Sequence, residues 1–524
     1  MNTVKGSGIL LLLFVFILTT SCQSKVDLKS EMDKKPNIIF ILADDMGYGD
    51  VGAFNKDSKI KTTHLDQMVA DGMIFTDAHS TSGVCTPTRY GVITGRYSWR
   101  SFLKSGVLTG KSKAMIPEDR STVASILQQQ GYHTAMIGKW HLGWDWALED
   151  STEFGGDGWT AGDCDNIVFT KEVTNTPNDI GFDYAYGISG SLDMAPYVYV
   201  ENGKVTGQPS SVTIDTAKYT WWREGPTGVD FKHEDVTPNL FRRSIAYVEE
   251  RSQSDDPFFL YLPLPSPHTP ILPTKEWQGK SINPYADFVE MIDHYIGQVV
   301  EATQKSGIEE NTLIMFMTDN GCSPEADFDI LRDAGHDPSY IFRGHKADIY
   351  EGGSRVPCIA KWPAKIAAGR SSDALVGTVD LMATVADITG YDLQDDEAED
   401  SFSMLPLFNG KEGKRESFIH HSVNGSFAIR QGDHKLIMCG GSGGWSYPRQ
   451  NDQAALDSLP PYQLYDLRAD PGETKNLFFE EEEKMNELKS LLTQQIKAGR
   501  TTSGSRQPND EHEGIWKQIA FIEE

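Results

Sequence analysis

The feature that most constrains the fold is a short, continuous apolar run, Ile38 to Ala43, which ends at two aspartates, Asp44 and Asp45. An apolar run of this length is typical of a strand that is buried on both faces of a parallel sheet. Further strands are expected at 133–137, 258–264 and 312–317, and helical patterns lie at 121–130, 244–251 and 286–304. This alternation predicts the α/β class, with a large, mostly parallel sheet sandwiched by helices.

The C-terminal part of the chain predicts a smaller subdomain. An acidic, polar stretch over 392–402 is interpreted as a linker. Beyond it we expect short antiparallel strands and a terminal helix, at 427–438, 463–467 and 480–496. The predicted division is a catalytic domain over 36–391 and a C-terminal subdomain of antiparallel sheet plus helix over 403–524.

The composition limits the classes of molecule that the protein can bind. Hydrophobic residues make up 39% of the chain, which suffices for a core and excludes global disorder. The 75 Asp and Glu against 48 Lys and Arg give a net charge of −27, so the chain lacks the basic footprint of a duplex-binding protein. We therefore expect no nucleic-acid partner. Because this charge repels polyanions at long range, an anionic substrate must meet a local positive site.

The first residues have the pattern of an export signal. Lys5 precedes an apolar run from Ile9 to Leu18 that is too short to span a bilayer, and small residues then lead to Cys22. The pattern resembles a relaxed lipoprotein signal, with a signal peptide over 1–21, a tether over 22–35 and a lipid on Cys22 as the only membrane anchor. The alternative is ordinary cleavage without lipidation. We expect an exported protein, either periplasmic or lipid-anchored to the outer membrane.

The six cysteines show neither a CxxC pair nor even spacing, so neither a zinc site nor a disulfide scaffold is indicated. Export would allow their oxidation, but we expect mostly buried free thiols. They are Cys22, Cys85, Cys164, Cys322, Cys358 and Cys439.

Four polar motifs directly follow predicted strands. Ligands of α/β folds gather at the carboxyl ends of the strands. Because the strands are identified from apolar runs and the motifs from polar residues, their coincidence indicates one site at this edge. The motifs are Asp44-Asp45, Lys139-Trp140-His141, Pro267-His268 and Asp319-Asn320.

The most specific motif is Cys85-Thr86-Pro87-Thr88-Arg89, followed by Thr94-Gly95-Arg96. It fits the C-x-P-x-R…T-G signature of sulfatases, in which the cysteine is oxidised to formylglycine (3-oxoalanine). From about residue 36 to 477 the chain resembles a type I sulfatase of the alkaline phosphatase superfamily, of the arylsulfatase-like bacterial glycan sulfatase kind. The resemblance implies a sulfuric ester hydrolase that depends on a formylglycine-generating maturation enzyme.

The chemistry of sulfate esters explains the residue types of this motif. A hydrated aldehyde at Cys85 carries two hydroxyls, one to attack sulfur and one to expel the sulfate by re-forming the aldehyde. Pro87 suits the first turn of a helix that begins here, and the helix N–H groups would point at the anionic centre. Arg89 could hold the hydrate through its guanidinium donors.

The aspartates predict a cation site. By resemblance, one divalent cation is bound by Asp44, Asp45, Asp319, Asn320 and the modified Cys85. Hard oxygen ligands suit Ca²⁺, or less well Mg²⁺, rather than Zn²⁺. Two-zinc phosphatases and phosphodiesterases of the superfamily place a histidine beside the second aspartate, so Asn320 at that position argues against a two-metal site.

Two further segments match sulfatase motifs. In GKWHLG, Lys139 is implied to bind a sulfate oxygen, and His141 to contact the formylglycine hydroxyl and act as the base that releases sulfate. His268 is implied near the ester oxygen, where it would bind sulfate and protonate the departing alcohol. Lys346, in a K-x(4)-E-G-G segment, would contact the sulfate, so Arg89, Lys139 and Lys346 form the required positive site. Other histidines are expected to be structural: His64, His79, His294, His345, His420 and His421.

The insertions between the motifs leave the substrate open. They contain aromatic and acidic residues that suit sugar binding, but core packing explains the tryptophans equally well. We assign no role to Trp144, Asp145, Trp146, Asp193, Trp221 and Trp222. By family analogy we expect sulfated glycans, such as galactose or N-acetylgalactosamine units. Two alternatives stay open, a phosphonate or phosphodiester hydrolase on the same fold and a catalytically inactive glycan-binding protein.

Overall fold

The computed structural model describes residues 34–150, 164–511 and 516–522. Within those residues, ten strands form one large sheet in the order β13-β2-β12-β11-β1-β10-β4-β5-β6-β7. The predicted signal peptide, most of the predicted tether and Cys22 lie outside the described residues. Among the described helices, none is long and apolar enough to cross a membrane.

The centre of the sheet is parallel, as predicted. β1 lies between β10 and β11, and β10 pairs with β4, which pairs with β5, all in parallel. Residues 38–43 of β1 are fully buried, which explains why the strand is a continuous apolar run. The central strands are β1 (Asn37–Asp44), β4 (His133–Lys139), β5 (Tyr184–Ile188), β10 (Phe258–Pro267) and β11 (Thr312–Thr318).

Both edges of the sheet are built from short strands. β12 runs antiparallel to β11 and β2, and β6 runs antiparallel to β5 and β7. Their shortness explains why the sequence did not predict them. They are β2 (Met73–Phe75), β6 (Val200–Glu201), β7 (Lys204–Val205), β12 (Cys358–Lys361) and β13 (Arg370–Ser372).

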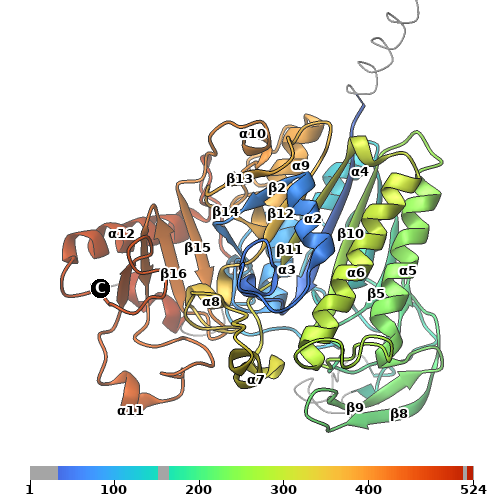
Figure 1. Cartoon of the computed structure of the whole chain (residues 1–524), viewed down its shortest axis with the longest axis horizontal. Helices are drawn as coiled ribbons and strands as arrows, with labels where there is room; N and C mark the ends of the chain where they lie inside the picture. Colours follow the sequence, from blue (N-terminus) through green and yellow to red (C-terminus); the bar gives the residue numbers. More distant parts are fainter. Residues whose placement is uncertain (1–33, 151–163, 512–515, 523–524) are drawn as a thin grey trace, which may run out of the picture.

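Helices cover both faces of the sheet (Figure 1). On one face α6 packs between α5 and α2, and on the other α3, α4 and α9 pack against one another. α5 begins well before its predicted start and contains Pro238, a residue that removes one helical hydrogen bond. The helices are α2 (Thr63–Asp71), α3 (Cys85–Thr94), α4 (Val123–Gln129), α5 (His233–Arg251), α6 (Pro284–Lys305) and α9 (Leu381–Thr389).

The C-terminal subdomain is an antiparallel sheet with a terminal helix, as predicted. Its strands, in the order β15-β16-β17-β18, turn at Gly432 between the second and third, where φ is +58°. Leu488, Leu492 and Ile496 of the helix are buried against this sheet. The elements are β15 (Ser417–His421), β16 (Phe427–Gln431), β17 (His434–Ile437), β18 (Gln463–Asp466) and α12 (Glu482–Ala498).

Smaller elements connect these layers. A hairpin of β8 and β9 stands away from the large sheet at the end opposite the C-terminal subdomain (Figure 1). The short elements are β3 (Ala78–His79), β8 (Pro209–Asp215), β9 (Trp222–Gly228), β14 (Val376–Gly377), α7 (Phe328–Asp333), α8 (Glu351–Ser354), α10 (Leu405–Phe408) and α11 (Gln453–Leu456).

The acidic stretch 392–402 is partly buried. Glu399 pairs with Arg96 at 3.3 Å and with Arg120 at 2.8 Å. Asp400 pairs with Arg100 at 2.8 Å. These contacts hold the end of the stretch against the residues that follow α3.

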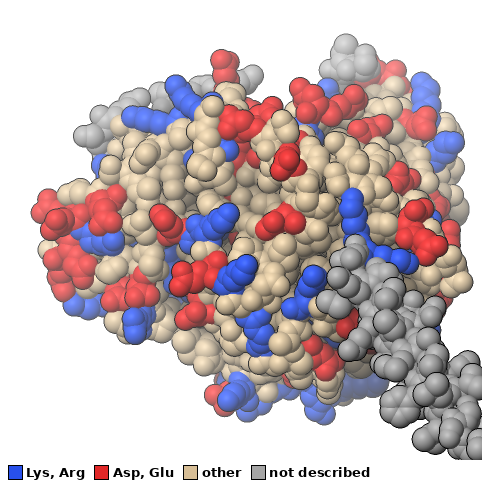
Figure 2. Space-filling view, turned by 90° about the horizontal axis from the view of Figure 1, so that it is seen from above, with Lys and Arg blue, Asp and Glu red and all other residues tan. Residues whose placement is uncertain are grey.

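The structure also shows the state of the cysteines and the distribution of charge on the surface. All five described cysteines are free thiols, four of them buried and Cys439 half-buried. Figure 2 shows acidic and basic side chains interspersed over one face, with acidic side chains gathered at the end formed by the C-terminal subdomain.

Candidate active site

The polar motifs that follow the central strands meet at one edge of the sheet. Ala43 of β1 lies beside Thr318 of β11, and Asp44 lies beside Pro267 of β10. The residues that come next along each strand therefore lie together at the carboxyl ends, where the sequence places the site. The buried residues gathered here are Asp44, Asp45, Cys85, Arg89, Lys139, His141, His268, Asp319, Asn320 and Lys346.

Cys85 is the first residue of α3, a helix whose residues are all buried. Pro87 lies in the first turn, where its missing N–H has no partner to lose. Burial raises the pKa of the Cys85 thiol to about 12, although Lys139 and Lys346 act in the opposite direction. In the protein alone, an unmodified thiol at this position stays protonated near neutral pH, which makes it a poor nucleophile.

Arg89 forms hydrogen bonds with residues at the ends of several central strands. Its guanidinium contacts Asp319 Oδ2 at 2.8 and 3.0 Å, and Asp44 Oδ2 at 3.4 Å. It also donates to the carbonyl oxygens of Lys139 at 2.9 Å and Leu264 at 3.1 Å. Burial lowers the pKa of Arg89, but Asp319 and Asp44 more than offset this, so the group stays charged. A contact between Arg89 and a hydrate on Cys85 stays a prediction.

Three carboxylates crowd one small volume. Ligand oxygens of Asp44, Asp45 and Asp319 lie within 4.8 Å of one another. Burial and the charge of Asp44 raise the pKa of Asp319 to about 7. Burial also raises the pKa of Asp44, but the charges of Lys139 and His268 prevail and hold it well below its usual range. Such a cluster is electrostatically costly unless positive charge offsets it.

The donor set of this cluster fits a single hard cation. Asp44 Oδ1 and Asn320 Oδ1 are buried and have no hydrogen-bond partner among the described residues. Asn320 Nδ2 donates to Asp45 Oδ1 at 2.7 Å and to the Gly321 carbonyl oxygen at 2.9 Å. Buried oxygens without partners are rare in proteins, and oxygen ligands are those that Ca²⁺ takes.

Two buried lysines flank the carboxylates. Lys139 Nζ donates to Asp44 Oδ2 at 2.5 Å and to Ser191 Oγ at 2.6 Å. Lys346 Nζ donates to Asp45 Oδ2 at 2.7 Å. Burial lowers the pKa of Lys346, but Asp45 and its neighbours raise it above its usual value. The amino groups of both lysines therefore lie beside the carboxylates, together with the guanidinium described above.

The two histidines of the site have defined proton positions. His141 Nε2 lies 2.8 Å from the Leu108 carbonyl oxygen, which can only accept, so Nε2 carries the proton and Nδ1 is the basic nitrogen. Nδ1 has no partner within the described chain. Burial, and next Lys139, hold the pKa of His141 well below its usual value, so the ring is neutral at physiological pH. A neutral ring with a free basic nitrogen can accept a proton.

His268 has the opposite arrangement. Its Nδ1 donates to the Thr269 carbonyl oxygen at 2.6 Å, so in the neutral ring Nε2 is the unprotonated nitrogen. Nε2 faces the carboxylates, 3.7 Å from Asp45 Oδ2, and the ring is part of a second cluster with Asp44 and Cys85. His268 can therefore donate a proton from Nε2 only when both ring nitrogens are protonated.

Ser191 is a site residue that sequence reasoning missed. It follows β5, the strand next to β4, and Lys139 of β4 lies beside Ile188 of β5. The loop after β5 therefore reaches the same edge of the sheet. Recognition of β5 as a parallel strand would have pointed to this loop, but β5 is short and begins with two tyrosines around one alanine.

One side chain of the C-terminal subdomain lies close to the site. The Trp445 ring lies 5.9 Å from Lys346 Nζ, and the side chain is half-exposed. Asp348 fixes this loop by accepting from the backbone N–H groups of Trp445 at 2.8 Å and Ser446 at 3.0 Å.

The insertion residues have different environments. Trp144 and Trp146 are buried and pack edge to face at 5.7 Å, which is core packing. Trp222 stacks on His233 at 3.9 Å, whereas Trp221 is partly exposed and donates to Glu325 at 3.2 Å.

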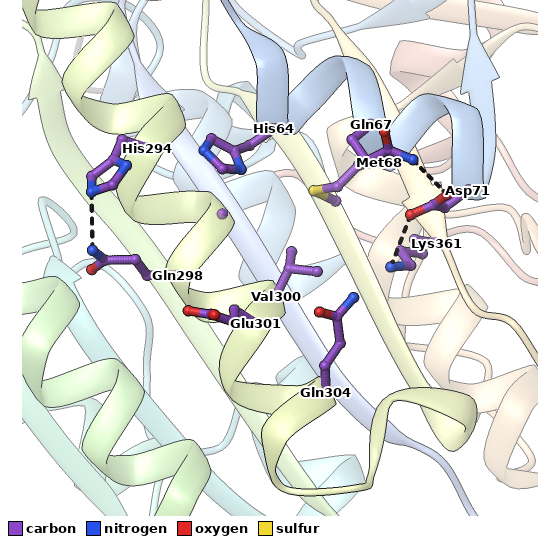
Figure 3. Close-up of a pocket in the computed structure, with 11 residues that line it drawn as sticks. His64, Gln67, Met68, Asp71, His294, Gln298, Val300, Glu301, Gln304 and Lys361 are labelled. Carbon is purple, nitrogen blue, oxygen red and sulfur yellow. Dashed lines mark hydrogen bonds and ion pairs between the residues drawn. The ribbon is translucent and has the colours of Figure 1, made fainter.

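The remaining histidines lie away from the carboxylates or in structural contacts. His64 and His294 line a hollow of about 370 Å³ between α2 and α6, which no predicted site residue lines (Figure 3). Gln298 contacts His294 at 3.0 Å there. His420 contacts the Ile349 carbonyl oxygen at 3.0 Å, and His79 contacts Asp77 at 2.9 Å.

Comparisons with known proteins agree with this geometry. The Sulfatase family profile matches residues 36–391, more than half of the chain, and a profile described as "N-sulphoglucosamine sulphohydrolase, C-terminal" matches residues 344–502. The chain belongs to the sulfatase family. The fold matches that of type I sulfatases of the alkaline phosphatase superfamily, and the enzyme is a sulfuric ester hydrolase.

Several relatives support this assignment. An N-acetylgalactosamine-6-O-sulfatase of Bacteroides thetaiotaomicron is 31% identical over 93% of this chain and 98% of its own length. Human arylsulfatase A is 31% identical over 85% of this sulfatase and 83% of its own chain. A solved structure from B. thetaiotaomicron, described under the metabolism of multiple glycosaminoglycans, has a TM-score of 0.76 and 30% identity, covering 88% and 99% of the two chains.

Proposed function

We propose that this sulfatase hydrolyses O-sulfate esters of glycans, with 6-O-sulfated N-acetylgalactosamine as the first candidate. The observation that carries the proposal is the buried start of α3, where Cys85 clusters with Asp44 and His268 and where the charges of Lys139, Lys346 and Asp319 act on it. The activity named for the B. thetaiotaomicron relative, which aligns over nearly the whole of both chains, supports the choice of sugar.

We infer that Cys85 is oxidised to formylglycine, whose hydrate supplies the attacking hydroxyl and the later release of sulfate. Only 3% of the Cys85 surface is exposed, so the maturation enzyme must reach this segment before the fold closes. One Ca²⁺, held by Asp44, Asp45, Asp319, Asn320 and the modified Cys85, would polarise the nucleophile and the sulfate oxygens. Mg²⁺ is the less favoured ion.

The side chains around Cys85 then have distinct tasks. Lys139 and Lys346 bind sulfate oxygens by turning their ammonium groups from the carboxylates that now hold them. Arg89 keeps Asp44 and Asp319 in place and orients the hydrate. His268, protonated on both nitrogens, donates from Nε2 to the departing alcohol, and His141 accepts a proton at Nδ1 during sulfate release.

The test is a panel of defined sulfated saccharides, incubated with matured protein and with Cys85→Ala. We expect release of free sulfate from 6-O-sulfated N-acetylgalactosamine by the wild type alone. Hydrolysis of an aryl phosphodiester faster than an aryl sulfate would favour the phosphonate or phosphodiester alternative. Binding of saccharides without any turnover by matured protein would favour the inactive glycan-binding alternative.

We also propose that the chain is exported and anchored through a lipid on Cys22, which lies outside the described residues. The support is the pattern of the first residues alone. Mass spectrometry of the mature N-terminus tests it, because a lipidated Cys22 and an unmodified or absent Cys22 give different peptides.

A further inference from the structure

One buried carboxylate of the site is not used by the proposed chemistry. Asp193 lies in the loop after β5, two residues beyond Ser191, and only 4% of its surface is exposed. Its Oδ1 lies 4.0 Å from His268 Nδ1 and has no hydrogen-bond partner in the described part of the chain. Asp193 therefore lies near Nδ1 of His268, whereas Asp45 lies near Nε2.

The other oxygen of Asp193 is fixed by the hairpin. Arg223, at the start of β9, forms an ion pair with Asp193 Oδ2, and its backbone N–H donates to the Asp193 carbonyl oxygen at 3.3 Å. The Arg223 guanidinium lies 5.1 Å from the Trp221 ring, which reaches the surface. Asp193 thus connects His268 with Arg223 and Trp221, at and just before the start of β9.

A buried, charged oxygen without a donor is costly, so its persistence indicates a donor that arrives with a ligand. The carboxylate clusters that could hold a cation do not include Asp193. His268 Nδ1 gives its hydrogen to Thr269 rather than to Asp193. The unpaired oxygen therefore lies beside His268, the predicted proton donor, on the Nδ1 side of its ring.

We propose that Asp193, held by Arg223, accepts a hydrogen bond from a hydroxyl of the sulfated sugar ring and thereby selects saccharide esters over aryl sulfates. The proposal rests on the proposed function. A neutral hydroxyl suits the position because the Arg223 charge already balances the carboxylate, so no cation is needed. A site built around a substrate hydroxyl discriminates strongly against an analogue that lacks it.

The first experiment compares Asp193→Asn with wild type on a 6-O-sulfated saccharide and on 4-nitrophenyl sulfate. Because Arg223 can only donate, it holds the amide oxygen, and the amide NH₂ replaces the accepting oxygen toward the substrate. We expect kcat/KM on the saccharide to fall about 10- to 100-fold, the range for a hydrogen bond to a charged group, and on the aryl ester by no more than a few-fold.

The matched control is Glu224→Gln, which makes the same acid-to-amide change at the residue that follows Arg223 on β9. Glu224 is exposed and, as a neighbour on a strand, points away from Arg223. We expect this variant to match wild type on both substrates. If Glu224→Gln lowers kcat/KM on the saccharide selectively and by as much as Asp193→Asn does, the loss of any negative charge near β9 would explain the result, and the proposal would be overturned.

The second experiment removes the hydroxyl from the substrate. Among monodeoxy analogues of the saccharide, one should have a lowered kcat/KM with wild type, and Asp193→Asn should cause no further loss on that analogue. If removal of each single hydroxyl from the saccharide leaves kcat/KM of the wild type unchanged, the proposal is overturned without the need for a variant. Equal losses for Asp193→Asn on the saccharide and the aryl ester also overturn it, whereas wild type inactive on every sulfate ester means that the proposed function itself has failed.

Discussion

Replacing Lys435 by methionine should expose how strongly the two parts of the chain are joined. Lys435, on β17, is fully buried and pairs with Glu351 of α8 at 3.0 Å and with Glu473 at 2.9 Å. α8 begins five residues after Lys346, so this contact links the C-terminal sheet to the segment that carries Lys346. Lys435→Met leaves two buried carboxylates with less positive charge, which costs about 3–5 kcal/mol of stability.

The matched control is Lys475→Met, which removes one partner of an exposed pair. Lys475 is 64% exposed and pairs with Glu480 at 2.6 Å. Exposed pairs contribute about 0–1 kcal/mol, so this variant should melt close to the wild type. Differential scanning calorimetry of both variants at pH 8 measures the difference. Equal melting temperatures for the two variants would refute the claim that the buried contacts of Lys435 with Glu351 and Glu473 stabilise the packing of the C-terminal sheet against α8.

The pH dependence of Lys435→Met gives a second readout. Burial, together with Glu351, raises the pKa of Glu473 to about 7, and Lys435 acts against this rise. A carboxyl whose folded pKa exceeds its unfolded value of about 4.3 destabilises the fold as pH rises between the two. Without Lys435 this destabilisation grows. The free energy of unfolding of Lys435→Met should therefore fall furthest below that of the wild type above pH 7, and the difference should shrink toward pH 5. A deficit that is constant with pH would contradict this origin.

Three further outcomes are expected. Mass spectrometry of active protein should show the Cys85 peptide about 18 Da lighter than its cysteine form, and full activity with an unmodified thiol would contradict the formylglycine assignment. Chelation should remove activity, Ca²⁺ should restore it better than Zn²⁺, and Asp319→Ala should mimic chelation; a metal-free active enzyme would contradict the cation site. His268→Ala should lose ~10²–10⁴-fold more rate on a sulfated sugar than on nitrophenyl sulfate, because a sugar alcohol needs a proton to depart, while His141→Ala should slow both alike. Equal losses for His268→Ala on both substrates would contradict its role as the acid.

The centre of the fold could be predicted because local sequence determines it. Residues 38–43 are apolar since every side chain is buried, and the aspartates that follow stand where the strand ends. The same logic predicts from the sequence that Lys139, His268 and Asp319 lie at one edge of the sheet. Four such strands suffice to place the site, because parallel strands end at the same side of a sheet.

What the sequence could not give depends on contacts between distant residues. The stretch 392–402 is interpreted from its acidic composition as a linker, but the sequence does not show that Asp400 is buried, because its partner Arg100 lies three hundred residues earlier. Asp193 likewise has no local signature. Its position beside His268 follows from β5, a strand too short to recognise, and its partner Arg223 comes from a separate hairpin.

The charges of the site explain how a chain of net charge −27 can hold a sulfate ester. Arg89, Lys139 and Lys346 bring three positive charges, and the carboxylates of Asp44, Asp45 and Asp319 bring three negative ones, so the protein groups alone sum to about zero when all are ionised. One divalent cation, if held by these carboxylates as proposed, would make the sum positive and would free both ammonium groups from the carboxylates that now hold them. In the protein alone Lys139 is paired with Asp44 and Lys346 with Asp45, so we expect the proposed sulfate site to need the cation as well. We therefore expect binding of the anion and binding of the cation to be coupled, each strengthening the other.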